Sequence, residues 1–321
     1  MVRFLLKKLA EAAFLLFLSF TLLFGLLRVL GDPAQMLLGQ RSDQASLEAI
    51  RKSLHLDKPL WQQYLYAWAD FLPYGEGGWR LPTLGISYQY GRPVGELYAE
   101  RFPATALLSL VALGIAAFMG IGAGLWHAYR PQPLLHMFSL VGLSLPGYVV
   151  GVLLIGVGAF ALGVLPPSGY VWIYDPVAEK VVFSPSHLFL PSVALALRPA
   201  AYLFQLTAAQ ARQILGADYI RAAYARGKAP LPVLLSDVLR NLLPALSVSL
   251  SQWLASLFTG ALFLEELFDW PGVGKLLFTA LSTSDFPLLM GTAQLSAALF
   301  IFLHTAGEVL AWRSDPRLRK S

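Results

Sequence analysis

The sequence predicts an all-α polytopic membrane protein with six transmembrane helices. Hydrophobic residues make up 56% of its 321 residues and charged residues only 13%, whereas a soluble domain carries about 25% charged residues. Apolar runs that reach the roughly 20 residues needed to cross a bilayer recur along the chain. Cysteine is absent, which excludes disulfides, thiolate metal sites and cysteine nucleophiles.

The apolar runs define the spans. The first run follows Arg3, Lys7 and Lys8, and no small-residue cleavage pattern comes after it, so we expect a retained helix rather than a signal peptide. The expected spans cover residues 9–30, 103–128, 134–163, 187–211, 244–264 and 288–312.

Prolines and glycines modulate three of these spans. Pro103 suits a helix start, whereas Pro146 and Pro191 should kink their helices or open them locally, which neighbouring helices make tolerable. The third span is rich in glycine, which predicts close helix packing. These glycines are Gly142, Gly147, Gly151, Gly156 and Gly158.

The net charge of +5 is unequally distributed across the membrane. One side holds 13 lysines and arginines against 3 acidic residues, and the other holds 9 against 14. The positive-inside rule therefore predicts that both termini and the loop at 212–243 are cytoplasmic. This asymmetry explains the basic charge without nucleic-acid binding.

The opposite side carries residues 31–102 and loops at 164–186 and 265–287. Residues 46–54 have the pattern of a short amphipathic helix. The segment is also rich in aromatic residues, which favour the membrane interface. They are Trp61, Tyr64, Tyr66, Trp68, Phe71, Tyr74 and Trp79.

The loop at 212–243 predicts a short helix–turn–helix. Ile220, Ala223 and Tyr224 form an apolar helical stripe, and Gly227 should end that helix. Pro230 and Pro232 should force an extended turn before a second helix at 233–243. A protruding helix–turn–helix of this kind could dock into a cleft of another protein. Composition alone also fits an ordinary basic loop.

Catalytic motifs are absent from the sequence. It contains no phosphate-binding loop of the form Gly-x-x-x-x-Gly-Lys-Ser/Thr, no His-Glu-x-x-His and no Gly-x-Ser-x-Gly. The five histidines are scattered, except that His304 lies four residues before Glu308 and therefore on the same helical face. An ionisable pair within a membrane is a functional candidate, but its position near the cytoplasmic end favours a pair that reaches the interface.

Short motifs along nearly the whole chain occur in a specific order. They are Arg3 to Leu9, Gly31-Asp32-Pro33, Leu37-Leu38-Gly39, Leu54 to Leu60 with Gln63-Tyr64, Gly91 to Val94, Glu100 to Thr105, Leu165-Pro166, Asp218 to Ala223 with Gly227, Arg240-Asn241 with Pro244, Glu265 with Phe268 to Gly274, and Asp315 to Arg319. In this order the chain resembles the dipeptide, oligopeptide and nickel branch of ABC importer permeases.

The resemblance implies a type I ABC importer permease-like fold and three parts. Residues 1–102 would form a first helix with an extracytoplasmic segment, 103–312 a permease core of five spans, and 313–321 a cytoplasmic tail. The loop at 212–243 would be the "EAA" coupling loop, seated in a groove of an ATPase. Its matching residues are Asp218, Tyr219, Ile220, Arg221, Ala222, Ala223, Gly227, Arg240, Asn241 and Pro244. A bulky or charged residue at Ala223 or Gly227 should then uncouple transport without preventing membrane insertion.

The resemblance also implies partners. They are a second permease subunit, usually a different chain, two cytoplasmic ABC ATPases and an extracytoplasmic solute-binding protein, all at a bacterial or archaeal plasma membrane. The chain itself would bind no cofactor, metal or nucleic acid and have no catalytic residue, and its partners would use ATP and Mg.

Two further groups of residues are candidate sites. Ser249, Gln252, Ser256 and Thr259 form one polar stripe on the fifth span, which fits either a translocation path or hydrogen bonds between helices. In the resembling family the region of Glu265, Trp270, Pro271 and Gly272 lies at the external gate or dock. Trp270 could equally anchor a structural loop at the interface.

The expected solute is a dipeptide or oligopeptide. Nickel or another small solute is the alternative, ranked lower because the histidines form no convincing metal relay. A membrane-embedded enzyme would need more converging reactive groups than His304 and Glu308, and a sensor would need a signalling domain that the nine residues of 313–321 cannot hold.

Overall fold

The computed structural model describes residues 2–30, 48, 51–52, 56–72, 74–75, 78–79, 82–175 and 180–314. The motifs at 31–33 and 37–39, most of the expected helix at 46–54 and residues 315–321 of the tail lie outside this part. The chain forms two compact units. Unit 1 comprises Met1–Pro103 and Gly272–Leu299, and unit 2 comprises Ala104–Pro271 and Phe300–Ser321.

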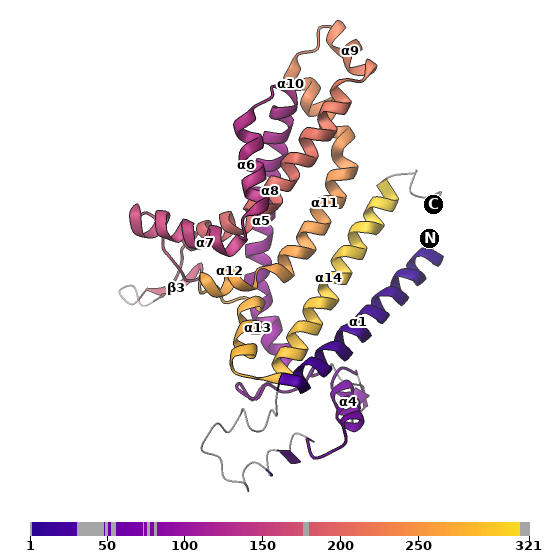
Figure 1. The fold of residues 1–321 in the computed structure, drawn as a ribbon, viewed down its shortest axis with the longest axis vertical. Coiled ribbons are helices and arrows are strands. Elements are labelled where there is room, and N and C mark those ends of the chain that lie inside the picture. The colour runs from indigo at the N-terminus through magenta and orange to yellow at the C-terminus, as the bar shows by residue number, and fades with distance from the viewer. Residues whose placement is uncertain are drawn as a thin grey trace. The chain divides into compact units, whose positions relative to one another are not determined.

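Unit 1 is built on the N-terminal helix. It contains α1 (Val2–Leu30), α4 (Leu60–Ala69), the two-residue strands β1 (Tyr74–Gly75) and β2 (Gly78–Trp79), and α13 (Val273–Ser282). The first turns of α5 (Val94–Tyr129) and the first half of α14 (Phe286–Ser314) complete it. In Figure 1 α1 runs beside this half of α14, with α4 near one end of α1.

Aromatic packing holds α4 to α1. The ring centroid of Phe20 lies 4.4 Å from that of Trp68, 5.1 Å from that of Phe71 and 5.6 Å from that of Tyr64. Tyr64, Trp68 and Phe71 of the predicted aromatic segment thus pack against α1, and their position at the membrane interface stays a prediction. They complete a small core because edge-on and tilted aromatic contacts stabilise packing beyond area burial alone.

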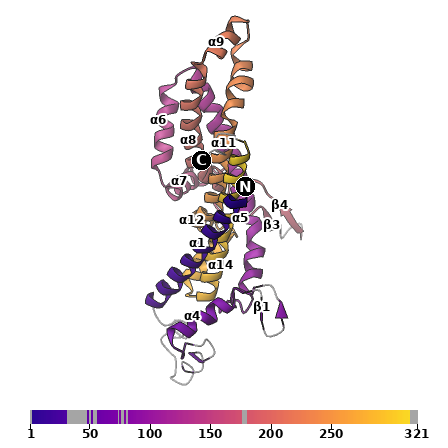
Figure 2. The same cartoon turned by 90° about the vertical axis from the view of Figure 1, so that its right-hand side faces the viewer.

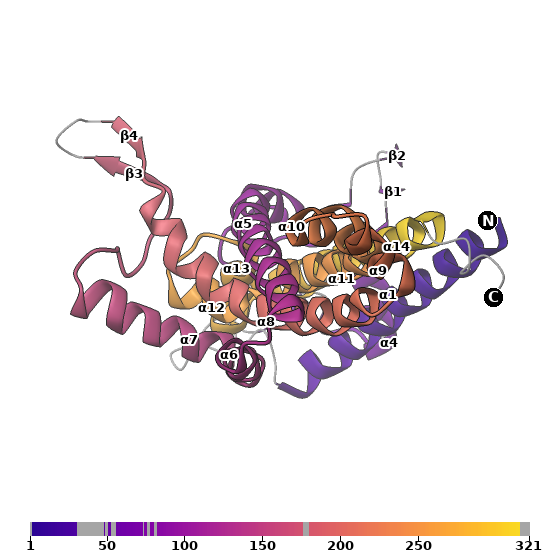
Figure 3. The same cartoon turned by 90° about the horizontal axis from the view of Figure 1, so that it is seen from above.

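Unit 2 is a helical bundle with α8 (Ser186–Leu215) at its centre. Around it pack α6 (Pro133–Ser144), α7 (Gly147–Leu154) and α11 (Leu239–Gly260), and α8 lies between α6 and α11 (Figure 3). A Cβ on Gly120 would lie 2.5 Å from the Ala200 carbonyl oxygen, so α5 approaches α8 at a distance that only glycine permits.

The remaining elements of unit 2 are short. They are the π-helix η2 (Ile155–Ala161), strands β3 (Trp172–Asp175) and β4 (Lys180–Phe183), α9 (Asp218–Ala225), α10 (Pro230–Pro232), the π-helix η3 (Val233–Val238) and α12 (Leu262–Leu267). Strands β3 and β4 form an antiparallel hairpin that pairs Trp172 with Phe183 and Asp175 with Lys180. This hairpin lies inside the 164–186 loop and was not predicted. Helix α9 occupies one end of the bundle (Figures 1 and 2).

The fold class predicted from the sequence is confirmed. Five described helices are long and apolar enough to cross a membrane, and a bent pair, Pro133–Ser144 with Gly147–Ala161, makes up to six. Close packing of the third span is also confirmed, because a Cβ on Gly151 would lie 2.7 Å from Leu267. The predicted kink at Pro146 is a much sharper break, with 110° between the two helices.

Several predicted boundaries are wrong because proline was treated as a helix boundary. Pro103 lies inside α5, which begins at Val94, and Pro244 lies inside α11, which begins at Leu239. Helix α8 is continuous through Pro191, so the helix does not break there, and the kink predicted as the other possibility stays a prediction. A proline inside a helix removes one backbone hydrogen bond but need not end the helix.

Candidate functional site

The candidate site is the segment between α8 and α11, built around α9. The extended backbone of Ala217 precedes the helix, and Asp218 lies in its first turn, where a carboxylate complements the helix dipole. The helix ends at Ala225, and Gly227 has a φ of +80°. The Gly227 N–H donates to the Tyr224 carbonyl at 2.8 Å. The prediction that Gly227 ends this helix is therefore confirmed, since φ in this region favours glycine.

Helix α9 has a buried face and an exposed face. Ile220 is 0% exposed and Ala223 4% exposed, and both belong to the hydrophobic core of unit 2. Tyr224, predicted on the same apolar stripe, is 37% exposed, so that part of the prediction is wrong. Asp218, Tyr219, Arg221 and Ala222 are exposed, and they form the surface that a partner could contact.

The two prolines after α9 do not make the predicted extended turn. The extended residue is Ala229, and Pro230 to Pro232 already form the first helical turn. Proline is suited to that position because a first-turn residue needs no N–H donor and its φ is preset. The helix then continues through η3 into α11, so the predicted second piece at 233–243 is only the beginning of a much longer helix.

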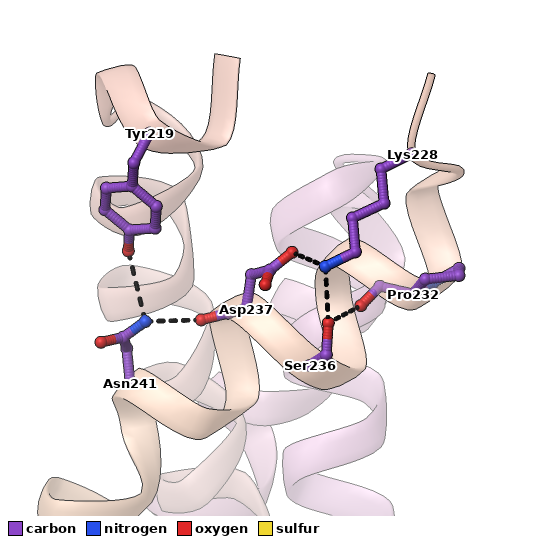
Figure 4. A network of polar contacts seen from close by, with 6 residues as sticks. All are labelled: Tyr219, Lys228, Pro232, Ser236, Asp237 and Asn241. Carbon is purple, nitrogen blue, oxygen red and sulfur yellow. Dashed lines mark hydrogen bonds and ion pairs between the residues drawn. The ribbon is translucent and has the colours of Figure 1, made fainter. Parts of the chain in front are cut away.

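A polar network spans this turn (Figure 4). The Lys228 Nζ donates to Oδ2 of Asp237 at 2.5 Å and to Oγ of Ser236 at 3.0 Å. The Ser236 hydroxyl donates in turn to the Pro232 carbonyl at 2.7 Å. Lys228, Ser236 and Asp237 were not predicted from the sequence as site residues, because a contact between residues nine apart across a turn follows no helical periodicity.

Asn241 connects the network to the other end of α9. Its Nδ2 donates to the Asp237 carbonyl at 2.6 Å and lies 3.4 Å from the Tyr219 hydroxyl, to which it donates a longer bond. Arg240 and Pro244, the neighbouring motif residues, are exposed. The residues predicted from the sequence therefore lie close together around α9. Ile220 and Ala223, however, are buried and pack α9 against the core.

The polar stripe on α11 is mostly exposed in the single chain. Gln252, Ser256 and Thr259 are exposed, whereas Ser249 is 6% exposed. The Thr259 hydroxyl lies 3.3 Å from the Ala255 carbonyl and 3.2 Å from the Ser256 carbonyl, both on its own helix. The exposed members therefore face outward from unit 2, where a solute or another subunit could reach them.

Glu265 and Trp270, by contrast, are completely buried. Thr105 Oγ1 donates to Oε1 of Glu265 at 2.6 Å, and Trp270 Nε1 donates to the Ala104 carbonyl at 2.9 Å. Pro271 is partly buried and Gly272 buried. The side chains of Glu265 and Trp270 are engaged within unit 2, where they tie the segment after α11 to α5.

The ionisable pair on α14 is also present. His304 Nε2 lies 3.6 Å from Oε1 of Glu308. Within the described residues, no three histidine, aspartate or glutamate side chains converge as a metal site would require.

Comparisons with known proteins identify two matching family models. Residues 106–320 match the model described as binding-protein-dependent transport system inner membrane component. Residues 1–110 match the corresponding N-terminal model. Together they extend over nearly the entire chain.

Individual relatives are similar over nearly their full length. The chain is 33% identical to the di/tripeptide transport system permease protein DppB of Pseudomonas aeruginosa, over 94% of this chain and 95% of the relative. It is 30% identical to the glutathione transport system permease protein GsiC of Escherichia coli, over 99% of both. A chain of the inward-facing MetNI methionine ABC transporter shares the fold, with a TM-score of 0.53 and 15% identity over 70% of this chain and 98% of that one.

Proposed function

This chain belongs to the family of binding-protein-dependent transport system inner membrane components, and from that premise we propose that it is the permease subunit of an ATP-driven importer of small peptides. Family membership makes it a multi-pass, non-enzymatic membrane subunit. Such a subunit acts with a partner permease, an ATPase that hydrolyses ATP, and a solute-binding protein.

The similarity to the di/tripeptide permease carries the proposal about the solute. The two relatives are named for di/tripeptides and for glutathione, which is itself a tripeptide. The shared chemistry is a chain of two or three amino acids with ionised ends. We extend that class of solute to this chain, and the stripe of Gln252, Ser256 and Thr259 supplies exposed hydrogen-bonding groups for a polar path.

The exposed face of α9 would receive the ATPase. Asp218, Tyr219, Arg221 and Ala222 lie on it, and the buried Ile220 and Ala223 hold it against the core. The excess of basic residues on this side supports a cytoplasmic location for the loop and for both termini. In the complete importer we infer two ATPase subunits and a second permease that is a different chain.

The residues at the external gate take a revised role in this proposal. Glu265 and Trp270 would stabilise the mouth from within, because their side chains are buried. Contact with the solute-binding protein would then fall to exposed neighbours such as Asp269.

Nickel transport and membrane-embedded catalysis remain as weaker alternatives. Both would rely on the pair of His304 and Glu308. Peptide uptake that is unchanged in a His304→Ala, Glu308→Gln double variant would count against both of them. Loss of peptide uptake by this double variant, with normal assembly of the complex, would instead favour nickel transport or catalysis.

The proposal is tested by affinity purification of the chain from native membranes, followed by mass spectrometry. We expect an ABC ATPase, a second permease and a peptide-binding protein to co-purify. The purified complex, reconstituted in liposomes, should take up labelled Ala-Ala and Ala-Ala-Ala in an ATP-dependent manner.

Two outcomes would contradict the proposal. Recovery of the chain alone, under conditions that preserve a known importer, would contradict the partner assignment. A complex that assembles and hydrolyses ATP when a loaded binding protein is added, but whose transport is not inhibited by peptides, would contradict the solute assignment. It would leave the assignment as an importer intact.

A further inference from the structure

Polar contacts join α9 and the turn that follows it to the continuous helix of η3 and α11. Near the start of α9, Asn241 of α11 donates to the Tyr219 hydroxyl. Beyond the end of α9, Lys228 donates its N–H to the Ala223 carbonyl of α9 at 3.2 Å, and its Nζ donates to the Asp237 carboxylate of η3. Asp237 takes part in both connections, because its carbonyl accepts from Asn241 while its carboxylate accepts from Lys228 (Figure 4).

The connection between α9 and α8 is of a different kind. It is the short turn at Gly216 and Ala217, held by backbone hydrogen bonds such as the one from Ala217 N–H to the Ile214 carbonyl at 3.0 Å. The polar side-chain contacts described above all run from α9 or its following turn toward η3 and α11. Side-chain polar contacts therefore give α9 a connection to η3 and α11 in addition to its covalent turn to α8.

We propose that Lys228 and Asp237 are a positioning pair that fixes the turn after α9 to η3, which continues directly into α11, so that movement of α9 moves α11. The proposal rests on the proposed function, in which an ATPase moves α9, and it identifies α11 as the helix that receives this movement. That helix also carries the exposed polar stripe of Gln252, Ser256 and Thr259.

The local backbone places Lys228 for this contact. Gly227 permits a tight reversal after α9, and the Gly227 and Lys228 N–H groups donate to the Tyr224 and Ala223 carbonyls of α9. The helix that follows includes the π-helical segment η3, a form that is uncommon and often found at functional sites. The Lys228 side chain bridges from this turn to η3 with a charge-assisted hydrogen bond.

The magnitude of the effect is bounded by solvent exposure. The Lys228 and Asp237 side chains are 37% and 27% exposed, so water screens part of their attraction. Partly exposed pairs of this kind shift an equilibrium by about two- to fivefold. We therefore expect partial uncoupling on removal of the pair.

The experiment uses the complete reconstituted importer and four variants of this chain. They are Lys228→Ala, Asp237→Ala, the charge swap Lys228→Asp with Asp237→Lys, and Glu96→Gln as a control. The control removes one contact of the exposed Arg92–Glu96 ion pair, which lies in the other unit. Three quantities are measured: hydrogen exchange of the α9 amides, binding-protein-stimulated ATP hydrolysis, and uptake of labelled Ala-Ala per ATP hydrolysed.

We expect each alanine variant to retain its partner subunits, to exchange the α9 amides about two- to fivefold faster, and to lose uptake per ATP by a similar factor. The charge swap should recover much of both quantities, and Glu96→Gln should match the wild type. Recovery by the swap is the result that a purely structural effect of lost side-chain packing would not produce.

The proposal is overturned if both alanine variants keep the wild-type uptake per ATP, or if the charge swap is no better than the single variants. Failure of the proposed function has a different signature. In that case the wild-type complex itself shows no peptide uptake, while hydrogen exchange still reports whether the pair holds α9.

Discussion

The Thr105 hydroxyl donates a 2.6 Å hydrogen bond to Oε1 of Glu265, and both residues are almost completely buried. This bond joins α5 to α12 across 160 residues of sequence. A carboxyl group without exposure requires such partners, because burying a polar group without a hydrogen bond is costly.

Thr105→Val should therefore destabilise unit 2. Removing one partner of a buried hydrogen bond costs about 1–3 kcal/mol, so we expect a lower thermal unfolding midpoint in detergent. Ser109→Ala is the matched control, since the Ser109 hydroxyl is buried on the same helix and has no hydrogen-bond partner among the described residues. Unchanged stability together with lost binding-protein stimulation would instead assign Glu265 to the gate.

Ala222 and Ala223 should respond in opposite ways to enlargement. Ala223→Leu inserts three extra carbons into a buried site, and overpacking of this kind costs about 1–3 kcal/mol. Ala222→Leu alters only the exposed face of α9, so it should weaken ATPase co-purification while leaving the unfolding midpoint unchanged. The earlier expectation for Ala223 is thereby revised, because its burial predicts a stability defect first. The reverse pattern of effects would show that α9 docks through its other face.

The α11 stripe predicts a loss of uptake without a loss of folding. Gln252→Leu combined with Ser256→Leu removes two exposed polar groups from one helical face. We expect the initial rate of Ala-Ala uptake to fall about tenfold, which corresponds to the loss of one or two hydrogen bonds of roughly 1 kcal/mol each, with normal assembly. Ser247→Ala, on the same helix but outside the stripe, provides the control, since its hydroxyl donates to the Pro244 carbonyl. Normal uptake in the double variant would favour a packing role for the stripe.

Tyr88 predicts a loss of stability in alkali. Burial and the nearby Asp285 carboxylate raise the pKa of Tyr88 to about 12, above its ordinary value of about 10. The folded protein thus holds this proton more tightly than the unfolded chain. The resulting stability, on the order of 2 kcal/mol, is complete below pH 10 and lost as the pH rises toward 12.

Thermal unfolding between pH 8 and pH 11.5 checks this prediction, with Tyr88→Phe as the comparison. The wild type should lose stability above pH 10 faster than the variant, which has no phenol to ionise. Parallel curves for the two proteins would mean that Tyr88 does not retain its proton on folding.

The sequence by itself determined the fold class and the location of the candidate site. Apolar runs identify membrane-spanning helices because the bilayer requires about 20 apolar residues for each crossing. Gly227 marks the end of α9 because its backbone conformation favours glycine. Both inferences depend on local chemistry, which a linear sequence contains in full.

Only the tertiary structure decided which candidate side chains are buried and which are exposed. Ala223 and Glu265 are buried while Ala222 and Gln252 are exposed, and this depends on contacts with α8, η3 and α5. The interactions of Lys228 with Asp237 and of Thr105 with Glu265 likewise join residues through space at separations unrelated to helical periodicity. Pro103 and Pro244 begin the predicted second and fifth spans, yet they lie inside α5 and α11, whose first turns precede them.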